Sequence, residues 1–348
     1  MATKGTFRFS FGPWNIHEGA DPFGPPVRDS VAFAKKLDCY KELGFDGVQF
    51  HDDDAVPNMN NLTASAIKSE AGKVKKQLDK HGLTAEFVAP RLWEDPRTID
   101  GGYTSNSKAD RQYAIDRSMR TIDIARELGT RNIVLWLARE GTYVREAKDS
   151  VEAVKRIAEA LQAMLDYDKE IRVMIESKPN EPMDHTYIPT IGHAIALGMM
   201  TSDPSRVGCL IESAHAILAG LDPSDEMGYA MAHKKLWSVH LNDQNGMKYD
   251  QDKAFGVDNL RQAFNQVKVL YENNFGDNGK FECVGLDVKA MRSQPASDCY
   301  AHIEKSKKVF EMLLEKVKRF DYKFQQECVK TQNFERLEMY VMELLMHD

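Results

Sequence analysis

The sequence predicts an α/β protein built as a (β/α)8 barrel, or TIM barrel, with a helical C-terminal tail. Three observations lead to this fold class. Short apolar runs alternate with amphipathic stretches along the chain, there are eight such runs, and no Gly-x-Gly-x-x-Gly motif follows the first of them. The alternation favours parallel strands joined by helices, and the count favours a closed barrel over an open sheet. The missing motif removes the main argument for a dinucleotide-binding sheet.

The expected strands are short apolar runs. They lie at Phe7–Trp14, Gly47–Asp54, Thr84–Pro90, Asn132–Ala138, Ile171–Ser177, Val207–Ser213, Leu236–Asn242 and Phe281–Val288. Between them, apolar residues recur at every third or fourth position, which is the period of a helix with one buried face. The expected helices include Ser30–Leu43, Ile67–His81, Arg111–Leu128, Val151–Tyr167 and Asp258–Asn273.

The C-terminal part of the chain differs from the rest. Beyond Ser297 it becomes helical in pattern and highly charged. We expect residues 1–320 to form the barrel and residues 321–348 to form a helical tail that packs on the barrel or on a neighbouring chain. No segment rich in Pro, Gly or Ser marks a linker to a second domain.

Composition limits the partners and the compartment. The chain has 348 residues, is 42% hydrophobic and 28% charged, and carries 46 Lys plus Arg against 53 Asp plus Glu, a net charge of −7. This acidic balance argues against nucleic acid or an anionic membrane as the main partner. Residues 1–14 lack the apolar core of a leader peptide, and the 5 cysteines lack C-x-x-C spacing. We therefore expect reduced thiols and a cytoplasmic location.

Polar side chains end four consecutive expected strands. The fifth to eighth runs end in Glu176, Glu212, His240 and Asp287. In a TIM barrel the chemistry lies at the carboxyl ends of the strands, and a charged group there costs free energy unless it is paired or bound to a metal. One such residue is explained as a helix cap or an ion pair, but four in sequence favour a metal site. Carboxylates with one imidazole suit Mn²⁺ or Mg²⁺, with Co²⁺ possible, rather than a thiolate zinc site.

Four segments resemble xylose isomerase in order and spacing. They are FHDDD (50–54), ESKPNEP (176–182), QNGMKYDQD (244–252) and DPFGPP (21–26). The resemblance extends from about Phe7 to Lys289, so the chain is identified by resemblance as a member of the xylose isomerase-like TIM-barrel superfamily. It implies an enzyme that acts on a sugar.

The resemblance also implies two metal sites. The ligands of a sugar-chelating metal would be Glu176, Glu212 and Asp287. The ligands of a second, catalytic metal would be Glu212, His215, Asp250 and Asp252. For Asp250 and Asp252 the alternative is a loop that survives from an isomerase ancestor without holding a metal.

The remaining candidate residues come from the same resemblance. His51 backed by Asp54 matches the pair that opens the sugar ring, and Lys178 matches the lysine that binds the carbonyl oxygen. The candidate substrate-binding residues, which include an apolar wall, are Trp14, Phe23, Trp93, Trp136 and Asn242. Aromatic faces in such a wall would stack on the C–H surfaces of a sugar.

One departure changes the expected chemistry. Xylose isomerases have an aspartate ligand at the end of the seventh strand, where this chain has His240 in the segment SVHLNDQNG. The order Glu176, Glu212, His240, Asp287 resembles the ketose 3-epimerase branch of the superfamily, in which one metal lies between carboxylates and a histidine. A neutral ligand in place of a charged one also leaves less negative charge to support two divalent ions.

The relative that fits best is the larger, catalytic subunit of bacterial C-deglycosidases. Those enzymes have this barrel, one Mn²⁺ site with a histidine ligand, and a small β-rich partner subunit, so the resemblance implies a hetero-oligomer. They cleave the C–C glycosidic bond of 3-oxo-C-glucosides. Removal of the acidic C2 proton would give an enolate that expels the aglycone, and the candidate bases are His51, Lys178 and His215.

Two other functions stay open. The first is an aldose–ketose isomerase such as xylose isomerase, or a ketose epimerase. The second is a non-catalytic sugar-binding barrel, against which the complete set of ligand residues counts.

Overall fold

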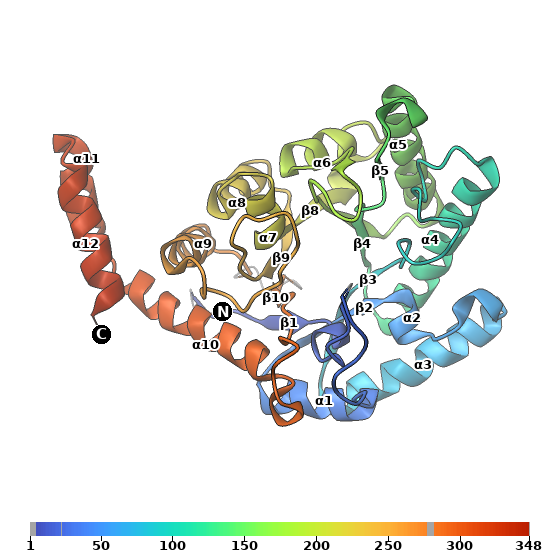
Figure 1. The fold of residues 1–348 in the computed structure, drawn as a ribbon, viewed down its shortest axis with the longest axis horizontal. Helices are drawn as coiled ribbons and strands as arrows, with labels where there is room; N and C mark the ends of the chain where they lie inside the picture. Colours follow the sequence, from blue (N-terminus) through green and yellow to red (C-terminus); the bar gives the residue numbers. More distant parts are fainter. Residues whose placement is uncertain (1–4, 22, 277–281, 348) are drawn as a thin grey trace.

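The computed structural model describes residues 5–21, 23–276 and 282–347 and shows a closed barrel of parallel strands (Figure 1). The order around the barrel is β1-β10-β9-β8-β6-β4-β3-β2. The barrel strands are β1 (Phe9–Phe11), β2 (Gly47–His51), β3 (Thr84–Ala89), β4 (Asn132–Trp136), β6 (Arg172–Glu176), β8 (Val207–Glu212), β9 (Leu236–Leu241) and β10 (Val284–Leu286). Each lies inside one expected strand, so the predicted fold class is confirmed. Phe281 of the eighth expected strand and Pro22 of the DPFGPP segment lie outside the described residues.

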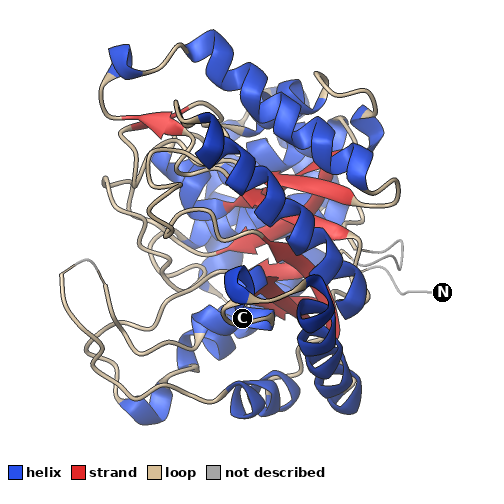
Figure 2. Ribbon diagram, turned by 90° about the vertical axis from the view of Figure 1, so that its right-hand side faces the viewer, coloured by secondary structure: helices blue, strands red, loops and turns tan. Residues whose placement is uncertain are grey.

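Helices surround the barrel, and loops gather at its carboxyl end (Figure 2). The helices are α1 (Phe33–Glu42), α2 (Asp52–Ala55), α3 (Ala64–His81), α4 (Lys108–Leu128), α5 (Ser150–Tyr167), α6 (Ile191–Gly198), α7 (Ser213–Leu218), α8 (Pro223–Ala232), α9 (Leu260–Glu272), α10 (Ala301–Lys318), α11 (Tyr322–Thr331) and α12 (Phe334–Met346). Short 3-10 helices lie at Pro13–Asn15, Met59–Asn61, Arg145–Ala147, Pro204–Arg206 and Ala296–Asp298. None of the helices in the described ranges is long and apolar enough to cross a membrane.

Helices α1, α3, α4, α5 and α9 coincide with the expected ones, and local chemistry fixes their ends. Helix α3 begins where the Thr63 side chain accepts a hydrogen bond from the Ala66 N–H (3.2 Å), and it ends at Gly82, whose φ is 68°. A side-chain oxygen satisfies a free N–H of the first turn, and glycine adopts the left-handed conformation of the helix end without strain. A short antiparallel sheet of β5 (Gly141–Thr142) and β7 (His185–Thr186) had no periodic signal in the sequence, because each strand has two residues.

A hydrogen-bonded group of polar side chains lies inside the barrel. Glu86 on β3 accepts hydrogen bonds from Ser10 on β1, from Gln49 on β2 (3.2 Å) and from Ser238 on β9 (2.7 Å). All four side chains are buried, and β3 and β9 are not neighbours in the barrel, so the bond from Ser238 crosses the interior. Three donors offset the cost of burying a carboxyl group, whose pKa burial raises above its usual value.

The strand register brings the predicted ligands together. Glu212 on β8 lies beside His240 on β9, and His240 lies beside Gly285 on β10, two residues before Asp287. Glu176 ends β6, the other neighbour of β8. Parallel strands present their carboxyl ends at the same rim, so these four side chains converge there as expected.

The helical C-terminal region is present. Helices α11 and α12 lie beyond α10 and away from the ring of barrel helices (Figure 1). They attach through Tyr340, which contacts Phe320 (ring centroids 5.5 Å apart), and through an ion pair between Arg261 and Glu338 (2.6 Å). The division into a barrel of residues 1–320 and a tail of residues 321–348 stays a prediction, and Asp348 lies outside the described residues.

A buried ion pair fixes the loop that follows β2. Asp52 is fully buried, and both of its oxygens accept hydrogen bonds from the guanidinium of Arg117 on α4, each at 2.7 Å. Thr121 donates a third hydrogen bond to Asp52 (3.1 Å). Because Asp52 follows His51 directly, this pair anchors the start of the segment FHDDD to the helix layer.

Removal of one partner should therefore destabilise the barrel strongly. Arg117→Met leaves the carboxylate of Asp52 buried without its countercharge, and we expect a loss of about 3–5 kcal/mol in the free energy of unfolding. Urea unfolding monitored by circular dichroism measures it. The matched control is Arg131→Met, which removes an exposed arginine paired with Glu170 and should cost less than about 1 kcal/mol. Equal losses in the two variants would show that the buried pair adds no more than a surface pair.

Candidate active site

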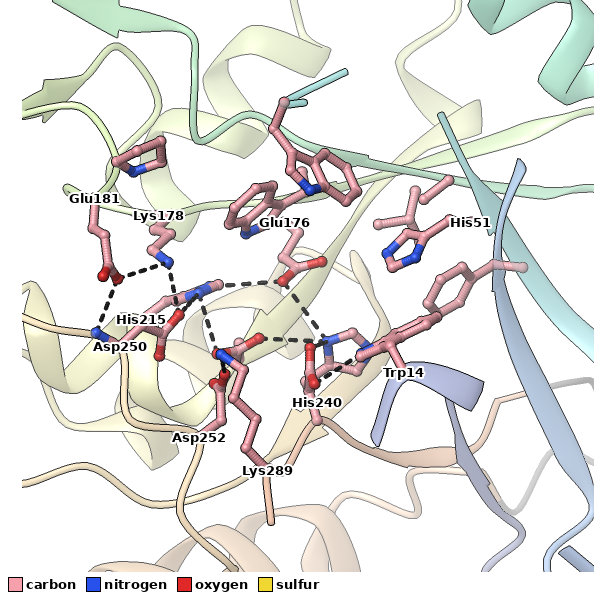
Figure 3. Close-up of a pocket in the computed structure, with 18 residues that line it drawn as sticks. Trp14, His51, Glu176, Lys178, Glu181, His215, His240, Asp250, Asp252 and Lys289 are labelled. Carbon is pink, nitrogen blue, oxygen red and sulfur yellow. Dashed lines mark hydrogen bonds and ion pairs between the residues drawn. The ribbon is translucent and has the colours of Figure 1, made fainter. Parts of the chain in front are cut away.

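A cavity of about 290 Å³ opens at the carboxyl end of the barrel (Figure 3). The charged and imidazole side chains that line it are His51, Glu176, Lys178, Glu181, Glu212, His215, His240, Asp250, Asp252, Asp287 and Lys289. The aromatic and apolar residues are Trp14, Phe87, Ala89, Trp93, Val134, Trp136 and Pro182. In Figure 3, Lys178 and Glu181 lie at one side of the cavity, and His51 and Trp14 lie at the other. A pocket with an apolar wall and a few converging polar groups is typical of a small-molecule site.

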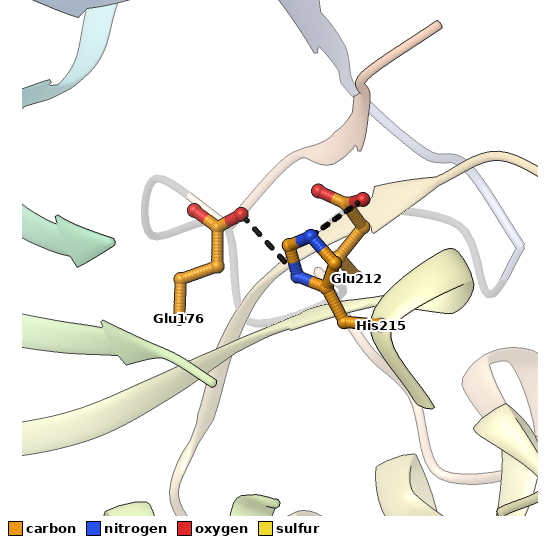
Figure 4. Close-up of side chains that lie close together, drawn as sticks. All are labelled: Glu176, Glu212 and His215. Carbon is orange, nitrogen blue, oxygen red and sulfur yellow. Dashed lines mark ion pairs between the residues drawn. The ribbon is translucent and has the colours of Figure 1, made fainter. Parts of the chain in front are cut away.

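Three overlapping groups of side chains in this cavity have the spacing of metal ligands. They are Glu176 with Glu212 and His215, Glu212 with His240 and Asp287, and Glu212 with Asp250 and Asp252. Within each group the ligand atoms lie within 4.8 Å of one another, and Glu212 belongs to all three. Figure 4 shows the first group, in which Nε2 of His215 lies 3.1 Å from Glu212 and Nδ1 lies 3.7 Å from Glu176.

The unsatisfied atoms of these groups fit a divalent cation. Nδ1 of His215, Nδ1 of His240 and Oδ1 of Asp250 are buried and have no hydrogen-bond partner among the described residues. Buried polar atoms without partners are rare in proteins, and these three belong to groups whose spacing could accommodate an ion. The predicted cluster can hold a metal, whereas the identity of the metal stays a prediction.

Hydrogen bonds fix the orientation of His240. Its Nε2 lies 3.1 Å from Oε1 of Gln49, an atom that only accepts, so Nε2 carries a proton and Nδ1 is the nitrogen that faces the carboxylates of Glu176 and Glu212. The amide nitrogen of Gln49 donates in turn to Ser10 and Glu86. A side chain at Gly285 would place a Cβ 2.5 Å from that amide nitrogen, so only glycine leaves room for this arrangement. In metal-binding histidines, a hydrogen bond from the ring nitrogen that does not face the metal fixes the tautomer.

Two lysines neutralise the acids on one side of the cavity. Lys178 contacts Asp250 (2.7 Å) and Glu181 (3.4 Å), and Lys289 contacts Asp252. Burial disfavours a charged ammonium, but the facing carboxylates outweigh it and hold the pKa values of both lysines above their usual range. Both side chains are therefore cations, and Lys178 is suited to donate a proton or a hydrogen bond rather than to act as a base.

Excess negative charge remains around Glu212. Burial, followed by the proximity of Asp250, Asp252 and Asp287, raises the pKa of Glu212 well above its usual value. Burial and the nearby Asp250 also raise the pKa of Asp252 to about 8. A divalent cation would relieve this repulsion and keep the carboxylates ionised.

Three of the four predicted aromatic wall residues line the cavity. Trp14 stacks on the ring of His51 (centroids 4.1 Å apart), and Trp93 meets both His51 (5.0 Å) and Trp136 (4.8 Å) with its edge or face. Phe23 lies elsewhere: its side chain is 80% exposed and touches the ring of Tyr249. Of the predicted wall residues, the three tryptophans therefore line the cavity, together with Phe87.

Asn242 lies behind the cavity rather than in its wall. Its side-chain nitrogen contacts Glu212 (3.0 Å) and Asp252 (3.1 Å), and its oxygen accepts a hydrogen bond from the Ala214 N–H (2.8 Å). The structure thus places this predicted substrate-binding residue where it positions carboxylates. The catalytic candidates His51, Lys178 and His215 line the cavity, and Asp54 supports His51 at 2.9 Å.

Three further residues of the site are absent from the candidates derived from the sequence. Arg91 lies two residues after the end of β3 and contacts His51, so the rule that polar groups gather at strand ends would have found it. Gln49 and Glu86 lie inside strands, where a polar residue within an apolar run was the available signal. The partners of these three residues depend on tertiary packing, which the sequence pattern does not reveal.

Comparison with known families supports the fold. The model of the family described as xylose isomerase-like TIM barrel matches residues 37–272, which is more than half of the chain.

Solved structures with the same fold include three sugar epimerases or epimerase-like proteins. A D-tagatose 3-epimerase-like protein has a TM-score of 0.64 at 16% identity and covers 89% of this chain and 99% of its own. An L-ribulose 3-epimerase has a TM-score of 0.63 at 14% identity, with 90% and 96% covered. The 3-keto-D-glucoside 4-epimerase of E. coli has a TM-score of 0.62 at 15% identity, with 87% and 100% covered. At these identities the likeness shows the fold alone.

Metal binding should stabilise the protein through Glu212. A ligand that binds only the folded state adds about 2.7 kcal/mol at one hundred times its dissociation constant, so Mn²⁺ should raise the thermal unfolding midpoint and a chelator should lower it again. Glu212→Gln should abolish this shift, because the residue belongs to every ligand group. Glu181→Gln, in the same cavity but outside the three groups, should keep it. Differential scanning calorimetry with and without Mn²⁺ tests both, and a full shift in Glu212→Gln would contradict the assignment.

The support that Gln49 gives to His240 should appear in metal affinity. Gln49→Leu removes the acceptor that fixes the tautomer of His240, and we expect the dissociation constant for Mn²⁺ to rise about 10- to 100-fold. Titration calorimetry on metal-free protein measures it. Gln266→Leu is the control, since Gln266 is equally buried but its side-chain oxygen accepts from Ser213. An unchanged constant in Gln49→Leu would mean that His240 is oriented without this hydrogen bond.

Proposed function

The chain belongs to the xylose isomerase-like TIM-barrel family, and from this premise we propose that it is a divalent-metal-dependent enzyme that acts on a sugar by moving a proton next to a carbonyl group. One observation carries the proposal: three ligand groups share Glu212 in a cavity walled by tryptophans. Acidic ligands suit a hard cation, and the aromatic wall suits the C–H faces of a sugar.

The specific reaction that we propose is cleavage of the C–C glycosidic bond of a 3-oxo-C-glucoside, with Mn²⁺ as the metal. A base takes the proton from C2, and the electron pair of that C–H bond becomes the C1=C2 double bond. The bond between C1 and the aglycone breaks, and the aglycone carbon receives a proton from an acid. The products are the aglycone and a sugar whose C1=C2 double bond is conjugated with the C3 carbonyl, so no oxidant or water is consumed.

The side chains of the cavity support the parts of this reaction. A divalent cation held by Glu176, Glu212, His240 and Asp287 would polarise neighbouring sugar oxygens and lower the cost of negative charge on them. The ammonium of Lys178 would donate to an oxygen that gains negative charge. Because Lys178 is a cation, His51 and His215 remain from the three bases that the sequence suggested.

Two findings favour this reaction over aldose isomerisation. His240 contributes no negative charge, and Asp250 and Asp252 are each paired with a lysine, so the support for a second divalent ion is weakened. One of the proteins with the same fold is an epimerase of a 3-keto-D-glucoside, the class of oxidised sugar that the elimination needs. The other two are 3-epimerases or epimerase-like, so a ketose epimerase is the second candidate.

A partner chain belongs to the proposal as well. We expect a small β-rich subunit and a higher oligomer in the cytoplasm. Exposed apolar residues on α11 and α12 support an assembly, because part of this tail face is uncovered; they are Val329, Phe334, Met339, Met342 and Met346.

Product analysis distinguishes the candidates. The purified, Mn²⁺-loaded protein is incubated with D-xylose, with a ketose and with a 3-oxo-C-glucoside, with and without a candidate small subunit. We expect no xylulose, release of the aglycone in the complete system, and incorporation of solvent deuterium at C2 of the glucoside. Glu212→Gln, which disrupts the ligand groups, should lose both the release of the aglycone and the incorporation of deuterium. Rapid formation of xylulose or of an epimer would replace the lyase by the isomerase or the epimerase, and sugar binding without any product would favour the non-catalytic barrel.

A further inference from the structure

The ring of His51 is held in one orientation at the edge of the cavity. Trp14 stacks on one face of the imidazole, and Trp93 meets it at an interplanar angle of 76°. Nδ1 lies 2.7 Å from Nη2 of Arg91 and 2.9 Å from Oδ2 of Asp54. His51 lines the cavity, and Nε2 is the other nitrogen of its ring. Its protonation therefore decides what His51 offers to a bound sugar.

Arg91 is itself fixed by surrounding acids. Its Nε donates to Asp53 (2.7 Å), its Nη1 to Glu94 (3.2 Å) and its Nη2 to Asp54 (3.0 Å). Its guanidinium also lies over the ring of Trp93 at 5.4 Å from the centroid. Burial disfavours the charged guanidinium, but Asp54 and Asp53 outweigh it and raise the pKa of Arg91. The group is a permanent cation with little freedom to turn away.

The nitrogens of an arginine side chain donate hydrogen bonds and do not accept them. The contact between Arg91 and Nδ1 is a hydrogen bond only when Nδ1 carries no proton, because a protonated Nδ1 would point its N–H at an N–H of Arg91 across 2.7 Å. In neutral His51 the proton must then lie on Nε2.

Asp54 does not need the imidazole proton. Its Oδ2 accepts from the backbone N–H of His51 (3.0 Å), and its Oδ1 accepts from Arg91 (3.0 Å). Asp54 is an anion satisfied by two other donors, and it balances the charge of Arg91.

We infer that Arg91 is a positioning residue that keeps His51 in the tautomer with its proton on Nε2, so that His51 presents a hydrogen-bond donor, and not a base, to the sugar. This inference deepens the proposed function and rests on it for the identity of the ligand. A sugar oxygen would bind at Nε2–H, and the base that removes the C2 proton is a different group.

Nitrogen chemical shifts of the imidazole test the tautomer directly. Long-range ¹H–¹⁵N correlation spectra of the full-length labelled protein distinguish protonated from unprotonated ring nitrogens, and the His51→Gln variant identifies the signals of His51. We expect Nε2 to be protonated and Nδ1 to be unprotonated. In Arg91→Met the pattern should reverse, because Nδ1–H is then free to donate to Asp54. Arg97→Met is the matched control: Arg97 pairs with Asp95 and should leave the His51 signals unchanged.

A protonated Nδ1 in the wild-type protein would overturn the inference, and this result needs no variant that folds. An unreversed pattern in folded Arg91→Met would overturn it too. Deuterium exchange at C2 of the 3-oxo-C-glucoside tests the role: His51→Gln, which keeps an N–H near the position of Nε2, should slow exchange only about tenfold, the cost of one hydrogen bond. A loss of about a hundredfold or more would make His51 the base. If the wild-type protein exchanges no C2 proton, the proposed function fails, and the spectra still decide the tautomer.

Discussion

Negative charge buried at the carboxyl end of the barrel is the constraint on which the rest of the site depends. Six carboxylates line one cavity, and Glu212 belongs to every ligand group. Such charges cannot be buried side by side unless cations compensate them. Lys178 and Lys289 compensate two of the acids from within the chain, and the unpartnered atoms of His215 and His240 face the others. Against the effect of burial, the remaining carboxylates raise the pKa of His240 well above its usual value, and a bound divalent cation would compensate them in place of that proton.

The position of His240 in this cluster explains why polar groups extend deep into the barrel. A metal-binding imidazole is useful only in one tautomer, and the acceptor that sets the tautomer of His240 is Gln49, from a strand on the far side of β1 and β10. Gln49 is held by Glu86 and Ser10, and Glu86 by Ser238. His240 is therefore one member of a hydrogen-bonded set. A chain with aspartate at this position would have no N–H to donate to Gln49, so the two residues are matched to each other.

The sequence predicted the barrel and the cluster of acidic side chains at its carboxyl end because both follow from local patterns. Eight apolar runs mark the strands, and the rule that chemistry lies at strand ends selects Glu176, Glu212 and Asp287 without any knowledge of packing. What the sequence does not reveal is which residue faces which across the barrel. Phe23 matches a family motif but is exposed in the chain, and Asn242 supports the acids from behind. Both outcomes depend on loop conformation and on side-chain direction, which have no periodic signal.

The segment FHDDD illustrates the limit of transferring chemistry by motif. His51 and Asp54 keep their spacing, and by themselves they would form a pair in which the carboxylate holds Nδ1–H and leaves Nε2 as a base. Arg91, which follows the neighbouring strand β3, places a cation against both of them. With Arg91 present, the same two residues offer the cavity a hydrogen-bond donor, Nε2–H, instead of a base. Neutral imidazole has one proton and two nitrogens. The group that contacts Nδ1 therefore decides whether Nε2 donates or accepts a hydrogen bond. The chemistry of this histidine is set by tertiary structure, in a residue that the motif does not contain.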